Sequence, residues 1–484
     1  MSKYFIFSAS RMDLYVCGQL IQTQPYRSRK FLEILFECLG YYHEVREYRE
    51  NLLNNYPRSF ICEFFNLNFN KDKYNNVKLM MIMLEICLCP EITTLKLSHL
   101  PPNEHYYALY LIIDLHPQLK KLDLRNVNMR NDQIMNMFKI IIGNCPELTN
   151  LNLTSPRPRF LVEVFEGTNL TSFSLDGVDI FEELTAEEVN RWPYLIHLEK
   201  LKFNQNISHL IHQDTIVAIL KKCPNLRSLR YGKGVVGALR IIQFITRLEK
   251  ISGWELTESD IIVIRDKCPE LRSIVVNYPA YNFTHSLHQL INLTNLELRQ
   301  FYMEQFTWNI SNFGFQLKKL RLFECNLKAL PIRLLAEHCQ DLKHLELEDI
   351  LIDFKGINQS FSNLKNLIIS FSVGQIYPSF TEVFKFIPAL ENLELTFWHS
   401  LENKDIISTL PLWTNMKLIK IDGSPNLDFD TMMAILRKCR KLKHLHNSET
   451  WSTCFWDVTM DNIIRARNSQ VCFYCHYSIG RNHS

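Results

Sequence analysis

The chain has 484 residues, 46% of them hydrophobic, and a formal net charge of +3 from 54 basic and 51 acidic side chains. This length exceeds the size at which a single compact core stops growing, so we expect several domains or an elongated repeat array. The nearly balanced charge gives no bulk electrostatic basis for binding nucleic acid or a membrane surface, so partners must be sought in local patches.

The N-terminus and the cysteines predict a reducing compartment. The first residues, Met1 to Ser8, lack the long apolar core of a secretory signal, and no apolar run reaches the roughly 20 residues of a membrane helix. Six of the 14 cysteines recur at one position of a repeat, where a free thiol serves as a small core hydrophobe. They are Cys89, Cys145, Cys223, Cys268, Cys339 and Cys439. We therefore expect a protein of the cytoplasm, the nucleus or both.

Residues 1–70 show no repeat and are expected to form a small helical module. The run from Phe31 to Leu39 has the spacing of an amphipathic helix. Its apolar face would carry Leu32, Leu35, Phe36 and Leu39. A second helix is expected from Glu44 to Leu53, before a Pro-containing break.

A leucine frame, L-x-x-L-x-L preceded by Cys-Pro, repeats through the rest of the chain, as in the run from Cys145 to Leu153. Proline stops the preceding helix. Leu151 and Leu153 then alternate with Asn152, which is the period of a short strand with one buried face. The first frame positions lie 22 to 29 residues apart, at Ile92, Leu119, Leu148, Leu170, Leu198, Leu226, Leu248, Leu271, Leu293, Leu317, Leu342, Leu364, Leu390, Met416 and Leu442.

This spacing predicts a leucine-rich-repeat solenoid over residues 74–447, with about fifteen repeats. The fold class is α/β, a horseshoe with a parallel sheet on the concave side and helices on the convex side. Thr185 with Glu188, and Thr257 with Asp260, have the spacing of helix-capping boxes. Between Leu248 and Leu317 the shorter intervals, which contain Tyr278 to Tyr281 and Asn309 to Asn312, predict short or irregular convex segments.

Residues 448–484 are expected to form a C-terminal cap and tail, because a solenoid exposes an apolar end unless something covers it. Cys472, Cys475 and His476 match half of a zinc site or a haem-attachment string, but the other half is missing; Cys454 and His483 are the groups that would complete it. The pair His209 and His212 has no third ligand. We assign no metal and no cofactor.

Catalysis by this chain is not expected. The sequence has no phosphate-cradling glycine loop and no G-x-S-x-G motif. In a solenoid of this type the residue between two strand leucines faces the concave surface, and the residue two positions further on faces the same way. On this surface arginines and aromatic residues are followed by an acidic stretch. Because arginine and tryptophan dominate interface hot spots, this is the candidate partner-binding surface. Its residues are Arg230, Trp254, Arg299, Arg321, Phe323, Glu346 and Glu348.

The Cys-Pro-x-Leu-x-x-Leu-x-Leu frame resembles the cysteine-containing leucine-rich repeats that are common in F-box proteins. Leu32-x-x-Leu35-Phe36-x-x-Leu39 is similar to the F-box helix L-x-x-I-F-x-x-L, which places a candidate F-box at about residues 25–60. Two parts of the motif are absent, the opening Leu-Pro and the later Val-Cys-x-x-Trp. A plain helical cap for the solenoid is the alternative.

The resemblance implies a non-catalytic substrate receptor of a Skp–cullin–F-box ubiquitin ligase. The apolar face of the N-terminal helix would bind a Skp-type adaptor and through it a cullin ligase. The solenoid would bind a protein substrate for ubiquitin-dependent degradation. The alternative function is a repeat scaffold that binds protein partners without any link to ubiquitin.

Overall fold

The computed structural model describes residues 93–96, 117–125, 127, 132–154, 156–176, 184–203, 213–231, 244–253, 256–325, 329–353, 355–371, 384–396, 401–422, 429–447 and 472–474. These residues fall in two compact units, divided between Leu226 and Arg227. Several predicted features lie outside the described residues: the helix carrying Leu32, Leu35, Phe36 and Leu39, and the residues Cys89, His209, His212, Trp254, Cys454, Cys475, His476 and His483.

The first unit is a parallel sheet in which the strand order follows the chain order. Each repeat therefore places its strand beside the strand of the preceding repeat, and Asp123 lies opposite Asn152 in this register. The strands are β1 (Thr94–Lys96), β2 (Lys121–Leu124), β3 (Asn150–Thr154), β4 (Ser172–Asp176) and β5 (Lys200–Phe203). The helices are α7 (Asp132–Asn144), α8 (Pro158–Gly167), α10 (Ala186–Asn190) and α11 (Gln213–Lys221).

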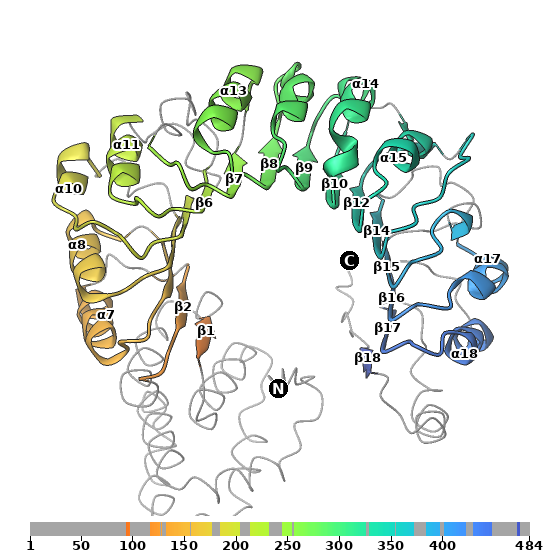
Figure 1. Ribbon diagram of the computed structural model, residues 1–484. Coiled ribbons are helices and arrows are strands. Elements are labelled where there is room, and N and C mark those ends of the chain that lie inside the picture. The colour runs from red at the N-terminus through yellow and green to blue at the C-terminus, as the bar shows by residue number, and fades with distance from the viewer. Residues whose placement is uncertain are drawn as a thin grey trace, which may run out of the picture. The chain divides into compact units, whose positions relative to one another are not determined.

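The second unit repeats this arrangement, with its strands along one side and its helices along the other (Figure 1). Its main-sheet strands are β6 (Ser228–Arg230), β7 (Lys250–Gly253), β8 (Ser273–Asn277), β9 (Asn295–Arg299), β10 (Lys319–Phe323), β12 (His344–Glu348), β14 (Asn366–Ser370), β15 (Asn392–Thr396), β16 (Leu418–Asp422), β17 (His444–Asn447) and β18 (Cys472–Tyr474). A small second sheet pairs β11 (Leu330–Pro331) with β13 (Ile352–Asp353). The helices are α13 (Glu258–Lys267), η4 (Phe283–Gln289), α14 (Met303–Phe313), η5 (Gly314–Gln316), α15 (Ile332–His338), α17 (Asn403–Thr409), η6 (Leu410–Leu412) and α18 (Phe429–Lys438).

The leucine frame explains the core of both units. In β9 the frame residues Leu296 and Leu298 are at most 1% exposed, whereas Asn295, Glu297 and Arg299 between and beside them are partly exposed. The same alternation recurs in β3, β12, β14, β15 and β16. Removing apolar side chains from water on one face of each strand holds consecutive repeats together. The predicted α/β leucine-rich-repeat fold is confirmed.

The cysteine of the frame lies where a helix ends and the chain turns toward the next strand. Cys268 follows the last residue of α13, and its Sγ donates a hydrogen bond to the Ile245 carbonyl at 3.0 Å. Cys339 follows α15 and is fully buried; burial raises the pKa of its thiol to about 12. Cys145, Cys223 and Cys439 are likewise buried, which confirms the predicted structural role for these five residues.

Both predicted capping boxes are present. Thr185 accepts from the Glu188 N–H at the start of α10, and Thr257 accepts from the Asp260 N–H at the start of α13. In each box the carboxylate reaches back to the backbone N–H of the threonine, so two otherwise unpaired donors are satisfied.

The prediction of short convex segments between Leu248 and Leu317 is correct for one of the three repeats in this range. The first repeat contains the ten-residue helix α13, so the prediction is wrong there. The segment Phe283–Gln289 forms the 3-10 helix η4. Residues 309–312, however, belong to the eleven-residue helix α14. The helix forms because Met303, Phe306, Ile310 and Phe313 fall on one face and are all buried.

The C-terminal prediction also needs a correction. The frame places the last strand near Leu442 to Leu445, but β18 follows and pairs in parallel with β17, with Phe473 opposite Leu445. The sequence gives β18 no leucine frame, so its pattern alone did not predict it. Within the described ranges, no helix is long and apolar enough to cross a membrane. The same described residues contain no group of metal-ligating side chains.

Candidate protein-binding surface

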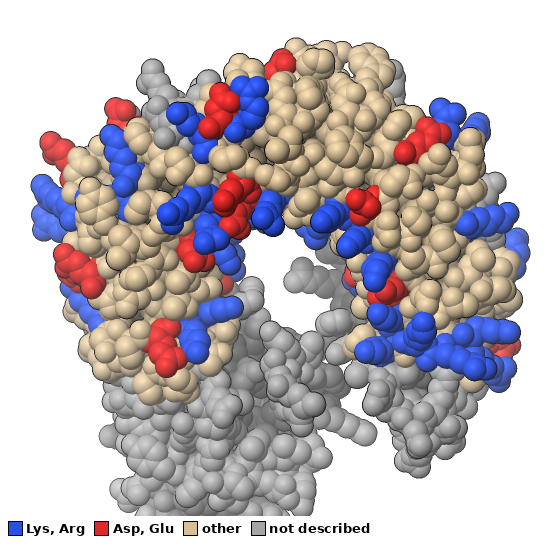
Figure 2. All heavy atoms as spheres, in the orientation of Figure 1, with Lys and Arg blue, Asp and Glu red and all other residues tan. Residues whose placement is uncertain are grey.

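The strands β9, β10 and β12 of the second unit place charged side chains side by side on their outward face. Because successive strand residues point to opposite faces, burial of the two leucines turns the residue between them outward. The parallel register then sets Glu297, Arg321 and Glu346 directly opposite one another on three neighbouring strands. Figure 2 shows basic and acidic side chains together along the strand side of this unit.

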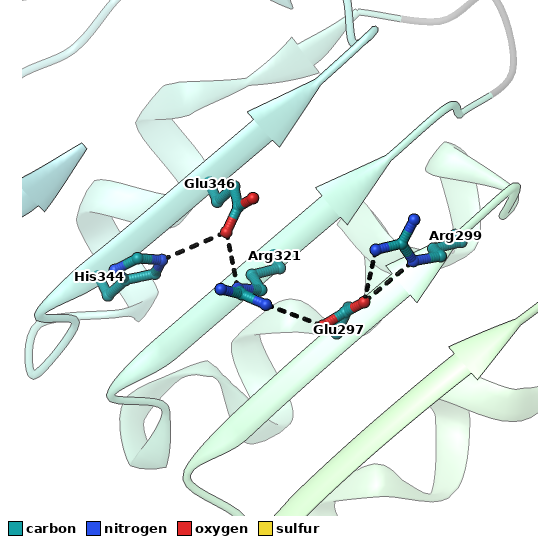
Figure 3. A network of polar contacts seen from close by, with 5 residues as sticks. All are labelled: Glu297, Arg299, Arg321, His344 and Glu346. Carbon is teal, nitrogen blue, oxygen red and sulfur yellow. Dashed lines mark hydrogen bonds and ion pairs between the residues drawn. The ribbon is translucent and has the colours of Figure 1, made fainter. Parts of the chain in front are cut away.

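These residues form a continuous network of ion pairs and hydrogen bonds (Figure 3). Arg321 lies at the centre: its Nε is 2.6 Å from Glu346 Oε2, and its Nη1 is 3.3 Å from Glu297 Oε2. Arg299 extends the network along β9, with its Nη2 2.9 Å from Glu297 Oε1. His344 extends it along β12, with Nε2 3.4 Å from Glu346 Oε2. Opposite charges that face one another across strands stabilise the pairing of those strands.

The carboxylates of this network are more buried than those of ordinary surface ion pairs. The side chains of Glu297 and Glu346 are only 14% and 17% exposed, whereas those of Arg299 and Arg321 are 41% and 33% exposed. Burial opposes ionisation of Glu346, but the hydrogen bond with His344 and the charge of Arg321 outweigh it, so the pKa of this carboxyl is lowered. The carboxylates thus hold the guanidinium groups in place, and the guanidinium groups offer the more accessible surface.

Phe323 does not provide the exposed aromatic contact that the sequence predicted. Its register position does face outward, opposite Arg299 on β9 and Glu348 on β12. The Arg299 guanidinium, however, covers its ring at 4.0 Å from the centroid, and Phe323 is only 3% exposed. Phe323 therefore supports Arg299 through a cation–π contact and is not itself available to a partner.

The other predicted surface residues differ in how they relate to the network. Glu348 lies on the outward row of β12, where partial burial and the nearby charge of Asp349 raise its pKa. Arg230 shares the register row of Glu297, but Ser252 on β7 and Val275 on β8 separate the two. The structure thus brings together Arg299, Arg321, Phe323, Glu346 and Glu348 and leaves Arg230 apart.

Two members of the network were not among the predicted site residues. Glu297 lies at an outward position of the frame but was not included in the predicted surface, and His344 was missed. The signal for His344 was available, because it lies two residues before Glu346 on the same strand and so shares its face. The arrangement offers fixed charges and hydrogen-bond donors, which suits binding of a complementary protein surface.

Glu346 is expected to make the second unit less stable in acid. Its pKa is lowered in the folded chain, so the ionised carboxylate stabilises the fold above the ordinary glutamate range of about 4 to 5 and loses that contribution as the pH falls through the folded pKa. We expect Glu346→Gln to reduce the fall in unfolding free energy between about pH 5 and pH 3. Urea titrations at several pH values measure this. Glu270→Gln, an exposed carboxylate change in the same unit, is the control; equal acid dependence of both variants would contradict the assignment.

Comparisons with known proteins find solved structures that are similar to this chain, among them these three. An internalin (inlF) from Listeria monocytogenes str. 4b F2365 is 18% identical, over 66% of this chain and 83% of that chain, with a TM-score of 0.37. The structure of the Rad7 and Elc1 complex in yeast matches at 14% identity over 72% of this chain and 89% of that chain, with a TM-score of 0.41. The leucine-rich repeat-containing protein LegL7 from Legionella pneumophila matches at 14% identity over 48% of this chain and 82% of that chain, with a TM-score of 0.33.

No family model matches the chain, and no curated protein matches it. Both units have the leucine-rich-repeat fold. That assignment stands on the chain's own frame, parallel register and buried leucine positions.

Proposed function

We propose that this chain is a non-catalytic receptor that binds a protein partner on the outward face of β9, β10 and β12. The observation that carries this proposal is the Glu297–Arg321–Glu346 network, extended by Arg299 and His344. The arginines are held by largely buried carboxylates before any partner arrives, so little side-chain entropy is lost on binding. Arginine in such a setting combines contact area with directional donors, which is the chemistry of interface hot spots.

The finer part of the proposal is that the receptor belongs to a Skp–cullin–F-box ubiquitin ligase. Its support is the resemblance of Leu32-x-x-Leu35-Phe36-x-x-Leu39 to the F-box helix, together with the cysteine-containing repeat frame. In this arrangement the N-terminal helix binds a Skp-type adaptor, the second unit binds the substrate, and the bound ligase components perform the ubiquitin transfer.

Adaptor binding is expected to depend on the apolar face of the N-terminal helix. The double change Leu35→Asp/Phe36→Asp puts two charges where the adaptor would bury apolar surface, so recovery of a Skp-type adaptor in a pull-down should fall at least about tenfold. Glu33→Gln/Glu37→Gln, on other positions of the same run, is the matched control and should keep full recovery. Failure of the native chain to recover any adaptor would contradict the ligase role.

A repeat scaffold without ubiquitin linkage is the second candidate function. It is favoured by the absence of the opening Leu-Pro and of the Val-Cys-x-x-Trp stretch from the F-box-like segment. Under this reading the N-terminal helix covers the apolar end of the repeats. The same pull-down distinguishes the two functions, because the scaffold would bind its protein partner whether or not Leu35 and Phe36 are changed.

A further inference from the structure

A second charged surface lies at the edge of the second unit where its strands begin, away from the outward face of β9, β10 and β12. The residues immediately before the main-sheet strands from β10 to β17 form one continuous backbone ladder: each N–H donates to the carbonyl of the equivalent residue in the preceding repeat, at 2.6 to 3.0 Å. These residues are therefore neighbours at strand spacing, about 4.8 Å apart. They are Lys318, Lys343, Lys365, Glu391, Lys417 and Lys443.

This row becomes continuous with the basic end of α18. Arg437 and Lys438 close the helix, and Arg440 and Lys441 follow before Lys443; all five side chains are exposed. Figure 2 shows Lys and Arg gathered over α18 and β17 with few acidic side chains among them. We call this surface the basic edge; it comprises Lys343, Lys365, Lys417, Arg437, Lys438, Arg440, Lys441 and Lys443.

Helix stabilisation explains only part of this charge. Cations in the last turn interact favourably with the helix dipole, which accounts for Arg437 and Lys438. Arg440 and Lys443 lie beyond the helix, and within the described part of the chain neither forms an ion pair with a carboxylate. Like charges gathered on one edge repel one another, which disfavours the free state.

One carboxylate within the row shows that the lysines of this row can bind carboxylate groups. Glu391 lies between two lysines, with Oε1 3.0 Å from Lys365 Nζ and Oε2 2.5 Å from Lys417 Nζ. Hydrogen bonds from Lys417 and Lys365 lower the pKa of Glu391. Lysines of the two flanking repeats thus already bind one carboxylate of the chain. Lys343 and Lys443 can bind further carboxylates from a partner.

The surroundings favour an acidic polypeptide over nucleic acid. Single-stranded nucleic acids are bound on surfaces that pair cations with aromatic side chains for base stacking. Among the described residues after Lys318, the large exposed apolar side chains are Ile407 and Leu412, neither of them aromatic. Leu412 lies in η6, against which α18 packs, so it offers an apolar contact beside the basic end of that helix.

We propose that the basic edge binds an extended acidic segment of a protein partner, with its carboxylates seated between lysines of neighbouring repeats. From Lys343 to Lys443 the row spans four strand steps, about 19 Å, which an extended segment of about six residues covers. This site is separate from the face carrying Arg321, and either surface can bind without the other.

The test is fluorescence anisotropy with the full chain at low ionic strength, where surface charges are least screened. The probe is a labelled peptide of about ten alternating glutamate and glycine residues. Lys438→Glu/Lys443→Glu should weaken its binding at least about tenfold, because two attractive contacts become repulsive. Lys267→Glu/Arg272→Glu makes the same charge change at the equivalent helix end and ladder position of an earlier repeat, and should stay within about twofold of the native chain.

Three results would overturn the proposal: no binding of the glutamate peptide, equal weakening by both charge-reversed variants, or tighter binding of a labelled DNA oligonucleotide of the same charge. A peptide with glutamine in place of glutamate should not bind. If circular dichroism shows that Lys438→Glu/Lys443→Glu does not fold, Lys438→Gln/Lys443→Gln replaces it, with an expected loss of about threefold. Unchanged binding by that milder variant would equally overturn the proposal.

Discussion

Replacing Leu320 by alanine is expected to lower the free energy of unfolding of the second unit by about 2–5 kcal/mol. Leu320 is the first frame leucine of β10, is fully buried, and lies opposite Leu296 and Leu345 on the neighbouring strands. Its truncation removes buried apolar surface and leaves a cavity that the tightly packed repeats cannot close. Urea denaturation measures the loss, and hydrogen exchange should become faster in β9, β10 and β12.

Leu320→Met is the matched control for this prediction. It keeps the side-chain volume and the apolar character, so its cost should stay below about 1.5 kcal/mol. Equal and small effects of alanine and methionine at this position would show that Leu320 does not contribute to a packed core. Neither change alters the charged residues on the opposite face of the strand.

Replacing Arg321 by methionine is expected to cost about 1–3 kcal/mol of unfolding free energy. The side chain keeps its apolar length, but Glu297 and Glu346 lose the cation between them while both remain largely buried. Because Arg321 is about one-third exposed, solvent screening keeps the loss below that of a fully buried ion pair. The loss should shrink when Glu297 is also changed to glutamine, because one unpaired charge is then removed.

Arg272→Met provides the comparison for Arg321. Arg272 is exposed at the edge of the sheet, so its replacement should change the unfolding free energy by no more than about 0.5 kcal/mol. A similar cost for Arg272→Met and Arg321→Met would contradict a structural role for the network. So would an Arg321→Met effect that is unchanged by Glu297→Gln, since neighbours in one network must couple.

The sequence predicts the fold well because the leucine frame determines both the repeat length and which face of each strand is buried. Leu296 and Leu298 identify the buried face of β9, and with it the outward position of Glu297 and Arg299. The repeat interval then sets the register, so the row of Glu297, Arg321 and Glu346 follows from counting along the frame. Capping boxes at Thr185 and Thr257 were likewise readable, because they depend only on local spacing.

The rest depends on side-chain contacts that spacing does not determine. Phe323 has the outward register position, yet its ring is covered because the Arg299 side chain folds back over it. The short interval around Asn309 to Asn312 predicted an irregular segment, but the buried face of α14 is set by Phe306, Ile310 and Phe313. The strand β18 carries no leucine frame and was therefore not predicted.

The basic edge corresponds to a sequence pattern that the net charge does not reveal. A net charge of +3 hides a lysine that recurs directly after the first frame position, at Lys318, Lys343, Lys365, Lys417 and Lys443. The frame gives the spacing of these residues. What the frame does not give is that Lys365 and Lys417 share Glu391, or that the row meets the end of α18.

The central claim is that the leucines of each strand hold the fold while the residues between them bind a protein partner. Quantitative affinity purification with mass spectrometry tests it most directly, using the native chain, Arg299→Ala/Arg321→Ala, and two controls. Leu320→Val mildly weakens the same strand from its buried side, and Arg227→Ala/Arg272→Ala removes two arginines away from the network. We predict that some proteins are captured by the native chain and by both controls. The recovered amount of these proteins should be at least about fivefold lower with Arg299→Ala/Arg321→Ala. Equal recovery by all four proteins would contradict the claim.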